Sequence, residues 1–187
     1  ANTDILSTRG VQLLGPMDGP LAEGESGPGR LMEPMDIVAA LSSAAPASAL
    51  TGQTVLITAG PTHEPIDPVR FIGNRSSGRM GFAIARAAAR VGARVILIAG
   101  PSALPTPQGV TRVDVRTALE MHSAVMEHAA DSRVFVAAAA VADFRMNAPA
   151  EQKLKKSGAP QTLTLIPNPD ILADVAALSN APFTVGF

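Results

Sequence analysis

The stretch Asn74–Gly81 reads Asn-Arg-Ser-Ser-Gly-Arg-Met-Gly and places small hydroxyls, glycines and arginines at the start of a helical pattern. Unpaired backbone N–H groups at a helix N-terminus, together with the helix dipole, favour phosphate oxygens. Gly78 lets a phosphate approach the backbone, and the hydroxyls of Ser76 and Ser77 add donors. The alternative is structural, with Ser77 as helix N-cap and the glycines as turn residues. The residues alone support the two interpretations about equally.

These glycines do not match the dinucleotide-binding fingerprint, which needs G-x-G-x-x-G directly after the first strand and an acidic residue after the second. Here Gly60 is followed by Pro61-Thr62-His63, and the second expected strand ends in Ala99-Gly100-Pro101. The P-loop pattern with its lysine is also absent. A nicotinamide-dependent reductase is therefore disfavoured, and a nucleoside triphosphate site of another kind stays open.

A second candidate site follows an apolar strand, in the run Ala138-Ala139-Ala140-Val141-Ala142-Asp143. Small side chains leave room for a flat base or a ribose. A carboxylate such as that of Asp143 can accept hydrogen bonds from a sugar or a base amine, or hold a divalent ion beside phosphates. The alternative is a loop aspartate that caps the next turn.

Two further groups have simple structural explanations. Lys153, Lys155 and Lys156 could neutralise charge on a transferred phosphorus centre, but closely spaced lysines more often form a solvated face. The run Asn168-Pro169-Asp170 ends a strand and begins a helix, with Asn168 suited to the cap and Pro169 to the first turn.

The elements that would position these residues alternate between strand and helix. Apolar strands that alternate with helices indicate a parallel sheet covered on both faces, a doubly wound, Rossmann-like α/β fold. In such folds ligands bind beyond the carboxyl ends of the strands, here after Ala59, Ala140 and Ile166. Strands are expected over Thr54–Ala59, Arg94–Ala99, Val110–Val115, Arg133–Ala140, Thr162–Ile166 and Phe183–Phe187, and helices over Gly78–Val91, Ala118–Ala130 and Asp170–Leu178.

The first helix carries an apolar face, and Gly92 is expected to end it. Its expected face comprises Met80, Ala83, Ile84, Ala87, Ala88 and Val91.

The N-terminal part differs in composition. Residues 1–42 are rich in glycine and proline, with short helical patterns at Thr3–Thr8 and Pro34–Leu41. Residues 43–50 are small and have the composition of a linker. We therefore expect a separate N-terminal piece, a linker, and a larger domain over residues 51–187.

Composition excludes several classes of protein. The chain of 187 residues has a net charge of −1, so neither nucleic acid nor an anionic membrane is an expected partner. It has no cysteine, and His122 and His128 do not share a helix face, which disfavours a histidine metal site. The longest apolar run, Val134–Ala142, is about half the length that crosses a bilayer, and no signal peptide is recognised. We expect a cytoplasmic protein, and a chain that begins without methionine looks like a fragment.

The order of motifs from Leu50 to Phe187 resembles phosphopantothenoylcysteine synthetase. The resemblance rests on Ile57–Thr62, Glu64–Arg70, Asn74–Gly78, Ala139–Asp143, Lys153–Lys156 and Asn168–Ile171. It implies an enzyme of coenzyme A biosynthesis in which CTP, with Mg²⁺, activates 4′-phosphopantothenate as an acyl-cytidylate and releases pyrophosphate. The amine of cysteine then displaces CMP. It also implies a homodimer through the synthetase half, and a higher oligomer with a decarboxylase half.

The same resemblance implies roles for individual residues. Asn74 would lie against the activated acyl group and Lys153 would meet the triphosphate, so these two are the candidate catalytic residues. The metal ligands stay unnamed. The nucleotide-binding candidates are Gly60, Ser76, Ser77, Gly78, Ala138, Ala139, Ala140, Asp143, Lys153, Asn168, Pro169, Asp170 and Phe187.

Residues 1–42 resemble the tail of the flavoprotein phosphopantothenoylcysteine decarboxylase, with Gly19–Leu31 as its substrate-covering loop. Many members carry a catalytic cysteine where this chain has Glu23, and the FMN-binding core would lie upstream. We therefore assign no decarboxylase activity to this chain, although its parent protein would carry it. The synthetase also continues past Phe187 in the family, so the chain alone is expected to be inactive. A reductase on a similar fold and a non-catalytic nucleotide-binding module remain the alternatives.

Overall fold

The computed structural model describes residues 2–11, 13–20, 25–44 and 50–187. The chain divides into two compact units, Ala1–Ala47 and Ser48–Phe187.

The first unit contains two helices and a hairpin. Helix α1 spans Asn2–Thr8, strands β1 (Met17–Pro20) and β2 (Ser26–Arg30) pair antiparallel, and α2 spans Pro34–Ala44. Both predicted helices are confirmed, but α2 runs three residues beyond Leu41 into the run of serine and alanine interpreted as linker. Alanine is the best helix former, so small residues after a helix extend it as readily as they end it. Glu23 lies outside the described residues.

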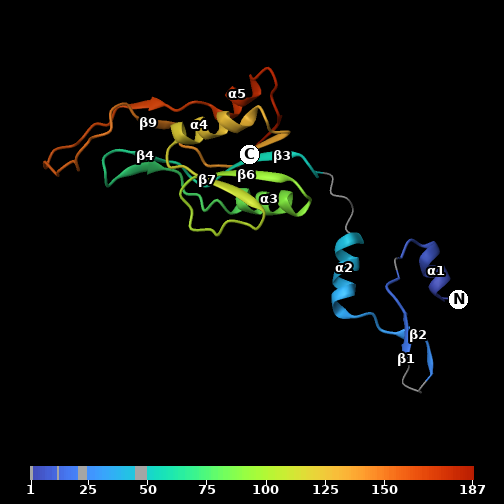
Figure 1. The fold of residues 1–187 in the computed structure, drawn as a ribbon. Coiled ribbons are helices and arrows are strands. Elements are labelled where there is room, and N and C mark those ends of the chain that lie inside the picture. The colour runs from blue at the N-terminus through green and yellow to red at the C-terminus, as the bar shows by residue number, and fades with distance from the viewer. Residues whose placement is uncertain (1, 12, 21–24, 45–49) are drawn as a thin grey trace. The chain divides into compact units, whose positions relative to one another are not determined.

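The second unit is built on a five-stranded parallel sheet, which confirms the predicted α/β class (Figure 1). The strand order is β11-β8-β3-β6-β7, and every neighbouring pair is parallel. The bounds are β3 Thr54–Ala59, β6 Arg94–Ala99, β7 Val110–Asp114, β8 Val134–Ala137 and β11 Phe183–Gly186.

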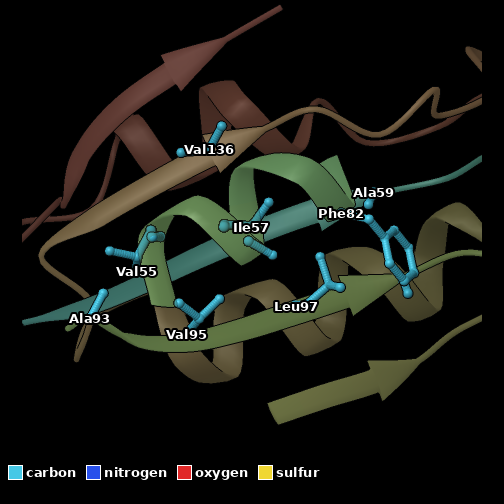
Figure 2. Close-up of a cluster of buried hydrophobic side chains, with 11 residues drawn as sticks. Val55, Ile57, Ala59, Phe82, Ala93, Val95, Leu97 and Val136 are labelled. Carbon is cyan, nitrogen blue, oxygen red and sulfur yellow. The ribbon is translucent and has the colours of Figure 1, made fainter. Parts of the chain in front are cut away.

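Helices cover both faces of this sheet. Helix α3 (Arg79–Arg90) lies on one face, and α4 (Ala118–Ala129) and α5 (Ile171–Ala176) lie on the other (Figure 1). Along β3, Val55 and Ile57 pack in the α3 layer, where Phe82 is buried (Figure 2), and Leu56 packs in the opposite layer. The central strand is therefore apolar on both sides, as its sequence predicted. No helix of the described residues is long and apolar enough to cross a membrane.

The predicted apolar face of α3 was only partly right. Ala88 is buried and Ile84 packs against the core, but Met80, Ala83, Ala87 and Val91 are exposed. The helix buries Gly81, Phe82, Ala85 and Ala88, whereas Met80 is 47% exposed. In an alanine-rich helix several faces are weakly apolar, so hydrophobicity alone does not determine which face packs on the sheet. The face that packs is the one that allows the closest approach of the two backbones. A Cβ added at Gly81 would lie 2.5 Å from the Cβ of Ala59, so the missing side chain sets how closely α3 sits on β3. The helix ends as expected, with the Gly92 and Ala93 N–H groups donating to Ala89 and Ala88.

This packing gives a first prediction. Gly81→Ala should destabilise the protein by about 1–3 kcal/mol through overpacking, although alanine is intrinsically the better helix former by about 1 kcal/mol. Urea unfolding measures the change. The matched control is Ala83→Gly on the exposed side of the same helix, which should cost only the propensity difference of about 1 kcal/mol. A more stable Gly81→Ala variant would contradict this account of the α3–β3 contact.

Four short strands of the second unit lie outside the central sheet. Strands β4 (His63–Pro65) and β5 (Phe71–Gly73) form an antiparallel hairpin that was not predicted. The strand expected at Thr162–Ile166 is β10 (Leu165–Pro167), which pairs antiparallel with β9 (Phe144–Met146). Its end is therefore not a carboxyl end of the parallel sheet, contrary to the expectation.

The end of β8 and the cap of α5 also differ from prediction. Strand β8 stops at Ala137 instead of Ala140, because the alanines beyond it leave the ladder, and only Ala140 forms an isolated bridge, with Pro61. Helix α5 is capped by Asp170, whose carboxylate accepts a hydrogen bond from the Ala173 N–H, so Asn168 is not its cap.

Candidate functional site

The site begins at the topological switch point of the sheet. Strands β3 and β8 are neighbours, but β3 connects onward to β6 on one side, and β8 connects onward to β11 on the other. Such a reversal opens a crevice beyond the carboxyl ends of the two strands. The segments that follow them meet there: the Ala140 N–H donates to the Gly60 carbonyl (2.8 Å), and the Thr62 N–H donates to the Ala140 carbonyl (3.3 Å).

Two glycines bring the start of α3 to this crevice. Gly60 and Gly78 both have positive φ, at 81° and 76°, which side-chain-bearing residues rarely adopt. A Cβ on Gly78 would lie 3.2 Å from the Cα of Gly60, and one on Gly60 would lie 3.1 Å from the Gly100 carbonyl oxygen. The backbone at the start of α3 therefore rests directly on the turn after β3.

No side chain caps the first turn of α3. Its N-cap is Gly78, so the structural alternative that made Ser77 the cap is wrong. Ser76 Oγ accepts from the Gly78 N–H (3.3 Å), and Ser77 Oγ is 3.5 Å from the Arg79 nitrogen. A hollow in front of this turn is lined by Arg75, Ser76, Ser77, Gly78, Arg79, Met80, Ala138, Ala139, Ala140 and Phe187. Uncapped N–H groups and two arginines make it suitable for an anion.

A second hollow, of about 310 Å³, adjoins the first at Ala139 and Phe187. Its lining also includes Thr58, Asp143, Asn168, Pro169 and Asp170. Thr58 Oγ1 accepts from the N–H groups of Ala138 (3.2 Å) and Ala139 (3.3 Å), which holds the alanine run in place. The hollow combines small apolar groups with two carboxylates, which suits a sugar or base with hydrogen-bond donors.

Asn168 links the two loops of this second hollow. Its Nδ2 donates to the Ala142 carbonyl (2.7 Å), and its backbone N–H donates to the Asp143 carbonyl (2.8 Å). Arg145 on β9 donates to Asn168 Oδ1 (3.2 Å) and to the Pro167 carbonyl. The β9–β10 pair therefore brings Asp143 beside a segment far away in the sequence.

Asn74 lies at the end of β5 and faces the same loop. Its Nδ2 donates to the Val141 carbonyl (3.0 Å) and, at a longer 3.4 Å, to the Ala140 carbonyl. These carbonyls fix the orientation of the amide, because only its nitrogen can donate to them.

Lys153 is placed differently from the other candidates. It lines a separate hollow together with Arg70, Lys155 and Lys156, and all three lysines are exposed. The other candidate site residues therefore lie at the crevice, whereas Lys153 lies on a separate basic segment.

Sequence reasoning missed several buried polar residues near the crevice. Thr62 Oγ1 accepts from the Ala142 N–H (2.9 Å), and Glu64 Oε1 accepts from the Ala118 N–H at the start of α4 (2.9 Å). The ring of His63 stacks on Phe71 at 3.8 Å. Burial and the nearby Arg116 lower the pKa of His63, and Glu64 only partly offsets them. The available signal was a run of three consecutive polar residues, Thr62–Glu64, shortly after a buried strand.

The described residues contain no group of three or more histidine, aspartate or glutamate side chains placed to hold a metal ion. His122 instead pairs with Asp174 on α5, at 2.8 Å.

Fold and crevice together define an open, doubly wound α/β domain with its site at the switch point. The chain belongs to the family described as "DNA/pantothenate metabolism flavoprotein C-terminal domain", whose model matches residues 50–187. It is similar to the coenzyme A biosynthesis bifunctional proteins CoaBC of Vibrio cholerae (55% identical) and Escherichia coli (49% identical). Both matches cover 100% of this chain and 47% of the relative, so the chain spans about half the length of these proteins.

A solved structure shows the same fold. The chain is 42% identical to the crystal structure of the C-terminal domain of a CoaBC protein, with a TM-score of 0.66. That likeness covers 75% of this chain and 66% of the other. The resemblance stated from the motifs is thereby confirmed at the level of the family.

Proposed function

We propose that this chain carries the phosphopantothenate–cysteine ligase part of a bifunctional coenzyme A biosynthesis protein. The observation that carries the proposal is the pair of adjoining hollows, which share Ala139 and Phe187 at the switch point. One presents an uncapped helix N-terminus with flanking arginines, and the other presents carboxylates and small side chains. Together they have the chemistry needed for a nucleoside triphosphate, which family membership favours as CTP.

In this proposal the phosphates lie against the first turn of α3, where Ser76, Ser77 and Gly78 supply N–H and hydroxyl donors. The cytidine occupies the hollow with Asp143, Asn168, Pro169 and Asp170, bounded by Phe187. Ala139 borders both hollows, Ala138 and Ala140 border the phosphate hollow, and the Gly60 carbonyl accepts the Ala140 N–H. Mg²⁺ would come with the triphosphate, because it is commonly bound by one or two carboxylates together with phosphate oxygens. Asp143 and Asp170 are the carboxylates available in that hollow.

The reaction then takes two displacements. A carboxylate oxygen of 4′-phosphopantothenate attacks the α-phosphorus of CTP and pyrophosphate leaves, with Lys153 stabilising the developing charge. The neutral amine of cysteine attacks the acyl carbon, loses a proton, and CMP leaves with the electron pair of the broken bond. Asn74 would hold the acyl oxygen during this second step.

We also propose that the parent protein is a homodimer through this domain and carries an FMN-dependent decarboxylase ahead of it. Both proposals rest on the family, and on a match to CoaBC that includes residues 1–42.

Nucleotide choice tests the proposed function. The full-length parent protein should consume CTP and release pyrophosphate only when phosphopantothenate is present. Parallel reactions with ATP and with NADPH separate the alternatives in a coupled pyrophosphate assay and an absorbance assay. Equal turnover of ATP would contradict the cytidylate route, oxidation of NADPH would favour the reductase, and CTP binding without turnover would favour a non-catalytic module.

A further inference from the structure

The tip of the β4–β5 hairpin holds a buried carboxylate that the proposed reaction does not use. Ile66–Arg70 forms the turn, closed by the Ile66 N–H donating to the Arg70 carbonyl (2.8 Å). The side chain of Asp67 is fully buried there. Its Oδ1 accepts from the N–H groups of Val69 and Arg70 (both 2.8 Å), so one oxygen alone would suffice to shape the turn.

The other carboxylate oxygen of Asp67 reaches across to a distant segment. Oδ2 accepts from the Leu154 N–H (3.1 Å) and from Arg70 Nε (2.9 Å) and Nη2 (2.5 Å). The same Arg70 Nη2 donates to the Leu154 carbonyl (2.6 Å). Both backbone polar groups of Leu154 are thus held by one ion pair, and Leu154 lies between Lys153 and Lys155.

A third bond ties this segment to the hairpin. The Ala150 N–H donates to the Ile66 carbonyl (2.9 Å). The chain entering the lysine segment is therefore fixed at Ala150 and again at Leu154, and both points of attachment are on the turn Ile66–Arg70.

The ion pair is charged over the whole physiological range. Burial opposes ionisation of Asp67, but the hydrogen bonds from Arg70 and from the N–H groups of Val69 and Leu154 outweigh it. They hold the pKa of Asp67 well below its usual range. Hydrogen bonds to an ionised group are about twice as strong as those between neutral groups, so Leu154 is held firmly.

The base of the same hairpin leads to the crevice. Strand β5 ends at Gly73, and Asn74 directly after it donates to the Val141 carbonyl. One short antiparallel unit therefore connects the crevice loop at one end with the lysine segment at the other.

We propose that Asp67, acting through Arg70 and the backbone of Leu154, is a positioning residue that places the Lys153 ammonium against the triphosphate of CTP. This inference rests on the proposed function. Asp67 touches no reacting atom in it. Its role is to fix a backbone whose long lysine side chain must reach the triphosphate in one geometry, since a displacement of about 1 Å can slow catalysis a hundredfold.

The test is a double-mutant cycle in the full-length parent protein. Asp67→Asn keeps the shape of the side chain but removes its charge. It also replaces one accepting oxygen by an NH₂ group, which cannot accept the hydrogen bonds donated by Arg70 or Leu154. We expect it to slow CTP-dependent pyrophosphate release by about tenfold to a hundredfold. In a Lys153→Gln background, the same substitution should slow the residual rate less than about twofold, because its effect passes through Lys153.

The matched control is Asp114→Asn. It breaks another arginine–aspartate pair, in which Arg112 Nη2 lies 2.7 Å from Asp114 Oδ1 on β7, and it should leave the rate unchanged. Arg70→Lys serves as a second variant, because it keeps the charge beside Asp67 and loses the reach to the Leu154 carbonyl. It should show the same dependence on Lys153.

Each outcome of the cycle either supports or overturns the positioning role of Asp67. Asp67→Asn could slow pyrophosphate release by the same factor in the wild-type background and in the Lys153→Gln background. That result would show that Asp67 only supports the fold, and it would overturn the inference. An unaffected rate in Asp67→Asn would overturn it as well, while leaving the ligase proposal intact. A parent protein without CTP-dependent pyrophosphate release would instead remove the proposed function, and this inference with it.

Discussion

Asn74→Asp should slow amide formation by about a hundredfold to a thousandfold, and the acyl-cytidylate should accumulate. A neutral amide has no proton to exchange near pH 7, so Asn74 must act through hydrogen bonds. Its Nδ2 makes one good bond, to the Val141 carbonyl, and a longer one of 3.4 Å to the Ala140 carbonyl. The second N–H is therefore the one that an acyl oxygen could take over. Aspartate has no such donor, and it would repel both carbonyls.

Rapid quenching and mass spectrometry check this expectation in the full-length parent protein supplied with CTP, phosphopantothenate and cysteine. The matched control is Asn180→Asp, because Asn180 Nδ2 also donates to a backbone carbonyl, that of Ala130 (3.1 Å). Both steps should be normal in the control. If pyrophosphate release and amide formation fall together in Asn74→Asp with no intermediate trapped, Asn74 serves binding or folding instead.

Lys153→Gln should reduce pyrophosphate release by about a hundredfold to a thousandfold, because a charge that stabilises the transition state is lost. Lys155→Gln and Lys156→Gln should change it little, since a solvated lysine contributes little. All three lysines are exposed and line the same hollow, so burial does not separate them. What distinguishes Lys153 is its place in the family motif, immediately before the residue that Asp67 and Arg70 hold.

The three variants serve as controls for one another, because each removes one positive charge from the same hollow. Initial rates of pyrophosphate release at saturating CTP and phosphopantothenate provide the comparison. Similar rates in all three variants would show that the lysines form only a solvated basic face. No lysine of this segment would then stabilise the first step.

The sequence predicted the sheet well because its strands are apolar on both faces. Thr54–Ala59 and Arg94–Ala99 are found with the predicted bounds, and the central five-stranded sheet is parallel throughout. Prediction failed where burial does not follow hydrophobicity. The face of α3 was predicted only in part, because its closest contact is made by Gly81, which has no side chain to count as apolar. The β4–β5 hairpin was missed because its strands are only three residues long.

The site was predictable in part for a similar reason. The carboxyl-end rule correctly brought Gly60 together with Ala138–Asp143, because both follow strands of the sheet. It could not indicate that Asn168 would bind the same loop, since that depends on the β9–β10 pair. Nor could it indicate the role of Asp67. An aspartate three residues before an arginine predicts a turn, but its partner Leu154 lies 87 residues away.

The glycines at the crevice have a consequence for motif searches. In a dinucleotide fold, one glycine makes the tight turn after the first strand, a second lets the ligand approach, and a third packs helix on strand. Here Gly60, Gly78 and Gly81 make comparable contacts, with Gly78 resting on Gly60 and Gly81 on Ala59. The β4–β5 hairpin lies between Gly60 and Gly78 in the chain. Glycines that meet in space are therefore separated in the sequence, and a search for a contiguous glycine motif does not detect them.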